Sequence, residues 1–349
     1  MFQDIYNPKH WLPSPSITQK IFIRSFFKFR LLGYYIIIMK NKIMKLAAVL
    51  LVIWLQLLIA DAAETFRIAT YNLENYVNNP ASGRPIKTKE SKEKICESIL
   101  AIKPDVLAVQ EIGSLELLLE LQKMLKDRGL NLQYYEFVNG WDTNIYVAIL
   151  SRFPIVERRS HTNENYLLHG RRFQVSRGFG EVDIQVNDQY KFTMFTCHLK
   201  SKRTVASADE AEMRLEEAKI LREKIESRLE KNPNANIVVA GDFNDTKDAP
   251  STKTILGRQN SRTGLVDTRP AEKNGDNLPP QRPGYSPRNI AWTHFYGKED
   301  TYSRIDYILL SRGMAREWVT NETYVLAIPN WGLASDHRPI VATFVAEDK

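Results

Sequence analysis

The sequence predicts an α/β (α+β) fold: a four-layer sandwich in which two packed mixed β-sheets are flanked by helices. Two observations lead to this prediction. Strand-like and helix-like segments follow one another from about Ala63 onward, and no internal repeat or linker divides them. With 43% hydrophobic and 26% charged residues, the chain also has ample apolar material for a core. Residues 63–349 are therefore predicted to form one domain.

The first predicted elements lie between residues 65 and 129. "TFRIATYNL" has the composition of a strand, and "KESKEKICESILAI" places Ile95, Ile99 and Ile102 at helical spacing. "DVLAVQEI" is a second buried strand. Ser114 is positioned to cap the helix "LELLLELQKMLKDRG", which ends at Gly129.

The rest of the chain is predicted to be rich in strands. The segments "YYEFV", "IYVAILSRFPI", "GEVDIQV" and "KFTMFTCHL" are strands, and the last two flank the polar turn "NDQ" as a hairpin. A charged helix from about Ala208 to Lys231 precedes the buried strand "NIVVAGDFN". Residues 257–303 have a loop composition. The strands "RIDYILLS" and "DHRPIVATFV", with a further region at Trp318–Val325, complete the chain.

The N-terminal region has the pattern of an export signal. Lys40, Lys42 and Lys45 precede the apolar run Leu46–Ala60, and "ADA" at 60–62 supplies a small-x-small cleavage site. The run is shorter than the ~20 residues that span a bilayer, so cleavage is favoured over a membrane anchor. We expect residues 39–62 to be a signal peptide and the protein to be exported, periplasmic or secreted, with no integral membrane span after cleavage.

Residues 1–38 do not fit a signal peptide that begins at Met1. Met39 or Met44 is a more natural start, so this stretch is interpreted as an over-extended start or an unstructured leader. A genuine N-terminal extension is the alternative.

Charge and cysteine content narrow the function classes. The chain carries a net charge of +7, but residues 1–62 hold eight basic and two acidic residues, which leaves 40 basic against 39 acidic residues and a net charge of +1. Charge therefore gives no support for nucleic-acid binding. Cys96 and Cys197 are expected to be free and buried, and no C-x-x-C or Cys/His spacing indicates a zinc site.

Polar side chains occur at the ends of several predicted strands. They are Asn72 in "TYNLEN", Glu111 in "VQEI", His198 in "TCHLKS", Asp242 and Asn244 in "VVAGDFND", Asp306 in "SRIDYILL", and Asp336 and His337 in "ASDHRPI". Each alone has a structural interpretation, such as a cap, a turn or, for Asp306, an ion pair with Arg304. Together they predict one cleft lined by hard oxygen ligands. Such a donor set suits a divalent cation of the magnesium type.

These motifs resemble those of the endonuclease/exonuclease/phosphatase superfamily, in the same order along the chain. "TYNLEN", "VQEI", "HLKS", "GDFND", "SRIDYIL" and "SDHRPI" cover about Phe66 to Phe344, and the combination of "GDFN" with "SDHRPI" is specific. The superfamily includes pancreatic-type deoxyribonucleases, abasic-site endonucleases, neutral sphingomyelinases and inositol polyphosphate 5-phosphatases. The resemblance implies the family's four-layer sandwich and hydrolysis of a phosphoester by in-line attack of water.

The resemblance also implies roles for the metal-binding side of the site. Glu111 would be the principal ligand of Mg²⁺ or Mn²⁺, with Asn72 and Asp336 close to the metal. Arg177 in "SRGFGEV" matches a position where the family often places a phosphate-contacting arginine.

The remaining matched residues would act on water and phosphate. Asp242 would orient or deprotonate the attacking water, and Asn244 would bond a phosphate oxygen. Asp306 would hold the imidazole of His337, which is either general base or transition-state stabiliser. His198 matches the deoxyribonuclease and sphingomyelinase branches, since abasic-site enzymes have a tyrosine there.

The predicted function is that of an exported, monomeric, metal-dependent phosphoesterase that cleaves phosphodiester bonds in DNA or RNA. A phosphatase or sphingomyelinase-like hydrolase of small or lipid phosphoesters is the alternative, for which "NIAWTHFYG" is the candidate membrane-facing loop. A non-catalytic binding module on the same fold is a third possibility.

Overall fold

The computed structural model describes residues 64–80, 85–272 and 291–349. The predicted signal peptide at 39–62 and the leader at 1–38 lie outside these residues. Among the described residues, no helix combines the length and apolar character needed to cross a membrane.

The larger sheet has seven strands in the order β12-β16-β17-β1-β2-β4-β3. It is mixed, because β1 pairs in parallel with β2 and antiparallel with β17. Its strands are β12 (Ala271–Glu272), β16 (Trp318–Val325), β17 (Ile340–Val345), β1 (Thr65–Tyr76), β2 (Val106–Ile112), β4 (Tyr146–Ser151) and β3 (Tyr134–Val138).

The second sheet has six strands in the order β11-β15-β10-β9-β8-β5. β9 and β10 are parallel, whereas β8 and β9 form the predicted antiparallel hairpin. Its strands are β11 (Val266–Asp267), β15 (Asp306–Leu310), β10 (Ile237–Asp242), β9 (Lys191–His198), β8 (Gly180–Gln185) and β5 (Ile155–Arg158).

Two small hairpins lie outside the large sheets. The first joins β6 (Asn165–Leu168) to β7 (Arg171–Gln174), and the second joins β13 (His294–Tyr296) to β14 (Thr301–Ser303). Short strands thus occur within 257–303, where the loop prediction is wrong in part. Their two or three residues are too few for a hydrophobic alternation to show in the sequence.

The described residues form four helices and one 3₁₀ turn, of which the sequence predicted the first three helices. They are α3 (Lys89–Ile102), α4 (Leu115–Asp127), α5 (Glu210–Lys231), α6 (Pro250–Leu256) and the 3₁₀ turn η1 (Trp331–Leu333). Ser114 caps α4, its side chain accepting a hydrogen bond from the backbone N–H of Leu117. α5 begins two residues later than predicted, because Asp209 is its N-cap and accepts from the N–H groups of Ala211 and Glu212.

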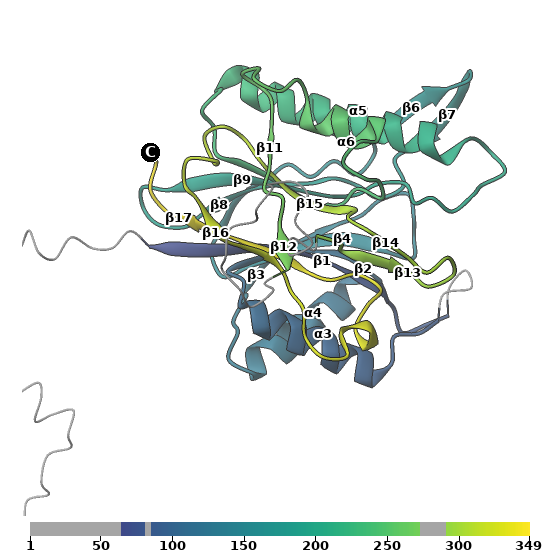
Figure 1. Cartoon of the computed structure of the whole chain (residues 1–349), viewed down its shortest axis with the longest axis horizontal. Coiled ribbons are helices and arrows are strands. Elements are labelled where there is room, and N and C mark those ends of the chain that lie inside the picture. Colours follow the sequence, from purple (N-terminus) through teal and green to yellow (C-terminus); the bar gives the residue numbers. More distant parts are fainter. Residues whose placement is uncertain (1–63, 81–84, 273–290) are drawn as a thin grey trace, which may run out of the picture. The chain divides into compact units, whose positions relative to one another are not determined.

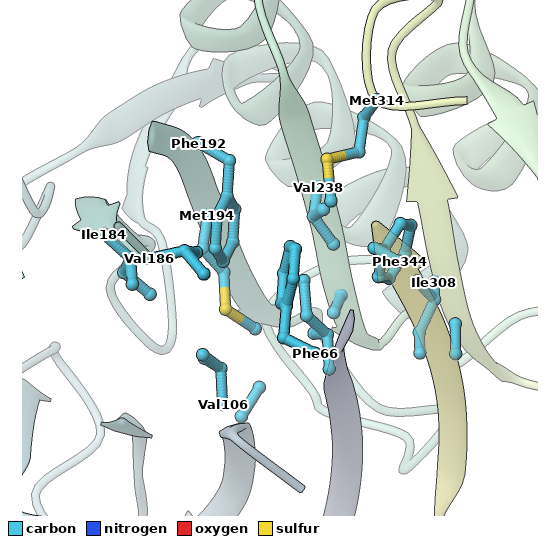
Figure 2. Packing of buried hydrophobic residues seen from close by; sticks show 14 of the residues in the cluster. Phe66, Val106, Ile184, Val186, Phe192, Met194, Val238, Ile308, Met314 and Phe344 are labelled. Carbon is cyan, nitrogen blue, oxygen red and sulfur yellow. The ribbon is translucent and has the colours of Figure 1, made fainter. Parts of the chain in front are cut away.

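Three apolar clusters separate four layers, as Figure 1 shows with α5 and α6 on one side of the sheets and α3 and α4 on the other. The middle cluster joins the two sheets. In it Phe66 of β1 lies 5.4 Å from Phe192 of β9 and 5.6 Å from Phe344 of β17, measured between ring centroids (Figure 2). The outer clusters pack α3 and α4 against one sheet and α5 against the other. The predicted four-layer sandwich is confirmed.

Cys96 and Cys197 are free and buried, as predicted. Cys96 belongs to the cluster beneath α3 and α4, whereas Cys197 belongs to the cluster beneath α5. Because the two thiols lie in different core layers, they cannot form a disulfide without unfolding.

A buried ion cluster holds β8 to its surroundings. Glu181, whose side chain is 2% exposed, accepts hydrogen bonds from Arg159 Nε (2.7 Å) and Arg228 Nε (2.7 Å), and it lies 2.8 Å from His161 Nε2. Burial raises the pKa of Glu181, but the contacts with His161, Arg159 and Arg228 outweigh burial, so the pKa lies below its ordinary value. The ionised carboxylate therefore stabilises the folded state.

We expect Glu181→Gln to lower the free energy of unfolding by about 3 kcal/mol at neutral pH, because it leaves the partly buried cations of Arg159 and Arg228 without their buried partner. A depressed folded-state pKa contributes stability that is complete above the unfolded-state pKa of about 4.3 and is lost as pH falls through the folded value. Urea unfolding of both proteins from pH 7 to pH 3 measures this. A difference that stays constant down to pH 3 would contradict the linkage.

Candidate active site

Three predicted site residues lie side by side at one edge of the six-stranded sheet. Asp242, the last residue of β10, pairs in register with His198 at the end of β9 and with Asp306 at the start of β15. They meet because β9 and β10 are parallel, while β15 runs the other way and begins where β10 ends. All three are almost fully buried, with exposed fractions of 1–2%.

Asn72 of β1 joins the two sheets at this edge. Its Nδ2 donates to Asp242 Oδ2 at 2.9 Å and lies 3.4 Å from Oε1 of Glu111, a residue of β2. His198 Nε2 lies 3.5 Å from the same oxygen of Asp242 and 3.8 Å from Glu111 Oε1. Four predicted residues from both sheets thus converge.

The backbone near Glu111 is held in an unfavourable conformation. Glu74, Asn75 and Glu111 have φ angles of +46°, +53° and +63°, in the left-handed region. Each such residue costs of order 1 kcal/mol or more and persists only where surrounding contacts impose it. One such contact is the hydrogen bond from Asn75 N to Glu111 Oε2 at 2.7 Å, which aims this carboxylate.

Asp306 pairs with His337, not with Arg304. Its Oδ2 lies 2.8 Å from His337 Nδ1, and both side chains are buried. Arg304 instead donates two hydrogen bonds to Asp267, at 3.0 and 2.7 Å. The interpretation of Asp306 as a simple ion-pair partner of Arg304 is therefore wrong.

The imidazole of His337 lies between two carboxylates, since its Nε2 is 3.8 Å from Asp242 Oδ2. Burial alone lowers the pKa of His337, but the charges of Asp306, Asp242 and Asp336 raise it well above its ordinary value. Burial, together with the charge of Asp306, raises the pKa of Asp242 to about 7. His337 is thus disposed to carry the positive charge and Asp242 to exchange a proton near neutrality.

Carboxylates gather on the other side of this pair. Asp336 Oδ1 is a buried atom with no hydrogen-bond partner among the described residues. Burial and the charges of Asp336 and Glu111 raise the pKa of Glu74, whose Oε2 accepts a hydrogen bond from Lys87 Nζ at 3.4 Å. Asp336 Oδ1 lies 3.8 Å from His337 Nε2, and a buried carboxylate oxygen without a hydrogen bond fits a divalent cation of the magnesium or manganese type. Two groups of potential ligands, His294–Asp336–His337 and Asp242–Asp306–His337, overlap because both contain His337.

Two residues near the site escaped the sequence prediction. Glu74 follows Asn72 by two positions. Its backbone is left-handed, so the alternation of a regular strand does not predict the direction of its side chain. His294 of β13 lies with its Nε2 3.6 Å from Asp336 Oδ2, and its ring centroid is 4.6 Å from that of His337. The sequence signal was a histidine inside "NIAWTHFYG", which aromatic neighbours made look like a surface loop.

Asn244 and Arg177 reach the edge of the site. Asn244 N donates to Asp242 Oδ1 at 2.8 Å, and its side chain donates to the carbonyl of Leu199 at 3.0 Å. Arg177 is buried, and its Nη1 lies 3.4 Å from the same carbonyl. Among the described residues, no recorded contact joins Arg177 to Asp242 or His337 directly.

Comparisons with known proteins identify the family and the fold of the chain. Residues 69–337 match the model of the Endonuclease/Exonuclease/phosphatase family. The fold is similar to that of a truncated Caenorhabditis elegans TDP2 (17% identity, TM-score 0.53, covering 81% of this chain and 98% of that one). It is also similar to that of the human Nocturnin catalytic domain with bound sulfate (17% identity, TM-score 0.55, covering 81% of this chain and 95% of that one). A third similar structure is that of SmcL (18% identity, TM-score 0.53, covering 80% of this chain and 99% of that one). The comparison with curated proteins finds no match.

Proposed function

Because this chain belongs to the Endonuclease/Exonuclease/phosphatase family, we propose that it is a divalent-cation-dependent phosphodiesterase, and specifically an exported nuclease. The family fold is that of a phosphoester hydrolase. The observation that carries the proposal is the convergence of Asn72, Asp242, Asp306 and His337 at one edge of the two sheets.

In the proposed mechanism Asp242 accepts a proton from the attacking water. Its pKa of about 7 suits this role, because a base works best when its pKa lies near the working pH. The amide of Asn72 donates to Asp242 Oδ2 and so fixes the carboxylate before substrate binds. His337, kept protonated by Asp306, would donate to the phosphoryl oxygens as negative charge develops on them.

Glu111, Asp336 and Asn72 would hold the cation, with Glu74 beside them. When bound, Mg²⁺ or Mn²⁺ would polarise the phosphoryl group and neutralise developing charge. Asn244 would bond a phosphate oxygen. His198 would support the carboxylates of Asp242 and Glu111, since its Nε2 lies within 3.8 Å of both.

A substrate panel tests the proposal. We expect the purified protein to cleave plasmid DNA or RNA with Mg²⁺ or Mn²⁺, more readily than sphingomyelin or inositol phosphates, and to lose this activity in excess EDTA. Full activity in EDTA would contradict the metal-dependent mechanism. Absence of hydrolysis on every phosphoester would favour a non-catalytic binding module.

A sphingomyelinase-like activity is the second candidate, and the hairpin β13–β14 favours it. Tyr302 and Leu333 are 55% and 57% exposed near this hairpin, as a lipid-facing surface would require. Trp292, however, packs against Trp331 and Tyr302 at centroid distances of 5.1 and 4.9 Å, so its ring is engaged within the protein. Preferential hydrolysis of sphingomyelin in the panel would establish this candidate over the nuclease.

Export is proposed from the N-terminal sequence. The cleavage site at 60–62 places the mature N-terminus at Ala63 or Glu64, directly before β1. N-terminal sequencing of protein recovered outside the cytoplasm measures this. A retained Leu46–Ala60 segment would indicate a membrane anchor instead.

A further inference from the structure

A cavity of about 560 Å³ opens next to the candidate active site. Three loops form it: residues 141–144 after β3, residues 176–177 before β8, and residues 200–205 after β9. Its charged lining is unbalanced, because Arg177, Lys200 and Arg203 face a single carboxylate, that of Asp142. A cavity with this excess of cations is suited to an anion.

Two of the three cationic side chains, those of Arg177 and Lys200, are buried. Arg177 and Lys200 are 6% and 8% exposed, so their long side chains are held in place and are not solvated surface groups. Lys200 Nζ donates to the carbonyls of Ser201 and Arg203 at 3.1 and 3.0 Å, which fixes its position at the cavity wall. Holding two like charges this close is costly unless a ligand or a neighbouring acid compensates for it.

Glu217 of α5 is the neighbouring acid, and it ties the two cationic loops together. It is fully buried and accepts hydrogen bonds from Ser176 N at 2.9 Å and Lys200 N at 2.6 Å. Its carboxylate is engaged by backbone donors and does not line the cavity. Within the cavity, Arg177 Nε lies 3.7 Å from Asp142 Oδ2, and Asp142 is the one carboxylate among the lining residues, so the lining keeps a net excess of positive charge.

The third loop is fixed against the first two. Asp142 N donates to the carbonyl of Ser176 at 2.7 Å. A Cβ on Gly140 would come within 2.6 Å of Gly178 N, so only glycine allows the two loops to approach this closely. The loop that carries Trp141 is thus held over the cationic wall.

Trp141 is the exposed aromatic residue among those that line this cavity. Its side chain is 67% exposed although it lines the same cavity as Arg177 and Lys200. An indole ring left in water beside a cationic wall is the arrangement that single-stranded nucleic-acid sites use, where bases stack on aromatic rings and cations hold the phosphates. A phosphocholine headgroup would instead bring a quaternary ammonium to the indole, and the positive charges of Arg177, Lys200 and Arg203 in the same cavity oppose a further cation there.

The cavity adjoins the catalytic groups through one peptide. The carbonyl of Leu199 accepts from Asn244 Nδ2 at 3.0 Å and from Arg177 Nη1 at 3.4 Å. Asn244 in turn bonds Asp242. The peptide of Leu199 therefore links Asn244, which would bond the scissile phosphate, to Arg177 of the cationic wall.

We propose that this cavity is a subsite for the nucleotide next to the scissile phosphodiester, with its base on Trp141 and its phosphate on Arg177 and Lys200. The inference rests on the proposed nuclease function and narrows its substrate to unpaired nucleic acid, because a base stacked in a duplex cannot reach the indole.

Trp141→Ala tests the subsite, with Trp141→Phe as the conservative variant and Leu167→Ala as the matched control, because Leu167 of β6 is an apolar side chain about as exposed as Trp141 and does not line the cavity. The substrates are a six-nucleotide single-stranded oligonucleotide and methyl 4-nitrophenyl phosphate. We expect Trp141→Ala to lower the ratio of kcat/KM between oligonucleotide and small diester about tenfold, mainly through KM, as stacking measurements suggest. Trp141→Phe should recover most of this ratio, and Leu167→Ala should leave it within twofold.

Binding measured without turnover separates the possible failures. In an Asp242→Asn background, fluorescence anisotropy of the labelled oligonucleotide should report a Kd about tenfold weaker when Trp141 is alanine. Equal Kd values, with the oligonucleotide still cleaved by the unmodified protein, would overturn the subsite alone. If the unmodified protein neither binds nor cleaves the oligonucleotide but hydrolyses sphingomyelin vesicles, both the nuclease and the subsite are excluded.

Discussion

Replacing Asp306 with asparagine should lower kcat by about four orders of magnitude and change KM little. The carboxylate lies 2.8 Å from His337 Nδ1, and its charge is the first of the influences that keep His337 protonated. Asparagine preserves the volume but removes this charge and can stabilise the wrong tautomer. The same substitution in the serine-protease triad costs about 10⁴ in turnover. Steady-state kinetics on one chosen phosphodiester measure the effect.

The double variant Asp306→Asn/His337→Ala distinguishes a cooperative pair from two independent residues. If the carboxylate acts through the imidazole, the double variant should be little slower than either single variant. Asp267→Asn is the matched control, because Asp267 is another poorly exposed carboxylate and holds Arg304 at the start of the same strand. It should lower stability but leave kcat nearly intact. If the losses in kcat of the two single variants multiply in the double variant, Asp306 and His337 act independently, and the proposed pair is contradicted.

Glu111→Gln should abolish the response to Mg²⁺ and lower activity about a thousandfold. The amide oxygen can still accept the hydrogen bond from Asn75 N, so the left-handed backbone should survive, while the charge that attracts the cation is lost. Several kcal/mol of transition-state stabilisation by a metal correspond to this loss in rate.

Metal binding itself provides the second measurement on Glu111. Thermal unfolding of the unmodified protein should shift upward with Mg²⁺, since a ligand of the folded state stabilises it, and the shift should vanish in Glu111→Gln. Glu116→Gln is the control: this glutamate is exposed at the start of α4, five residues away. An undiminished Mg²⁺ shift in Glu111→Gln would remove Glu111 from the metal site.

The fold followed from the sequence where apolar periodicity was strong. α3 and α4 match their predicted segments, because capping residues and regular isoleucine or leucine spacing mark both ends. The hairpins β6–β7 and β13–β14 were missed, since strands of three or four half-exposed residues carry almost no pattern. Their pairing depends on tertiary contacts.

The candidate site was predictable to the extent that its residues end regular strands. Asp242 and His198 could be placed together because parallel strands bring their carboxyl ends to one edge. The sequence could not place His294 in the site, because an isolated β-bridge between His294 and His337 brings it close to Asp336. The pairing of Arg304 with Asp267 was equally hidden, because the two are 37 positions apart and share no motif.

The hydrogen bond from Asn72 to Asp242 crosses from one sheet to the other, and the aromatic cluster around Phe66 lies between the same two sheets. Under the proposed mechanism, the rate of hydrolysis therefore depends on the distance between the two sheets. We expect mild urea to weaken the packing of the aromatic cluster while the backbone hydrogen bonds within each sheet persist. Asn72 and Asp242 would then move apart. Activity should then disappear at lower urea than far-ultraviolet ellipticity. Under the proposed mechanism, activity thus depends on the contact between the two sheets, and coincident loss of activity and ellipticity would contradict this dependence.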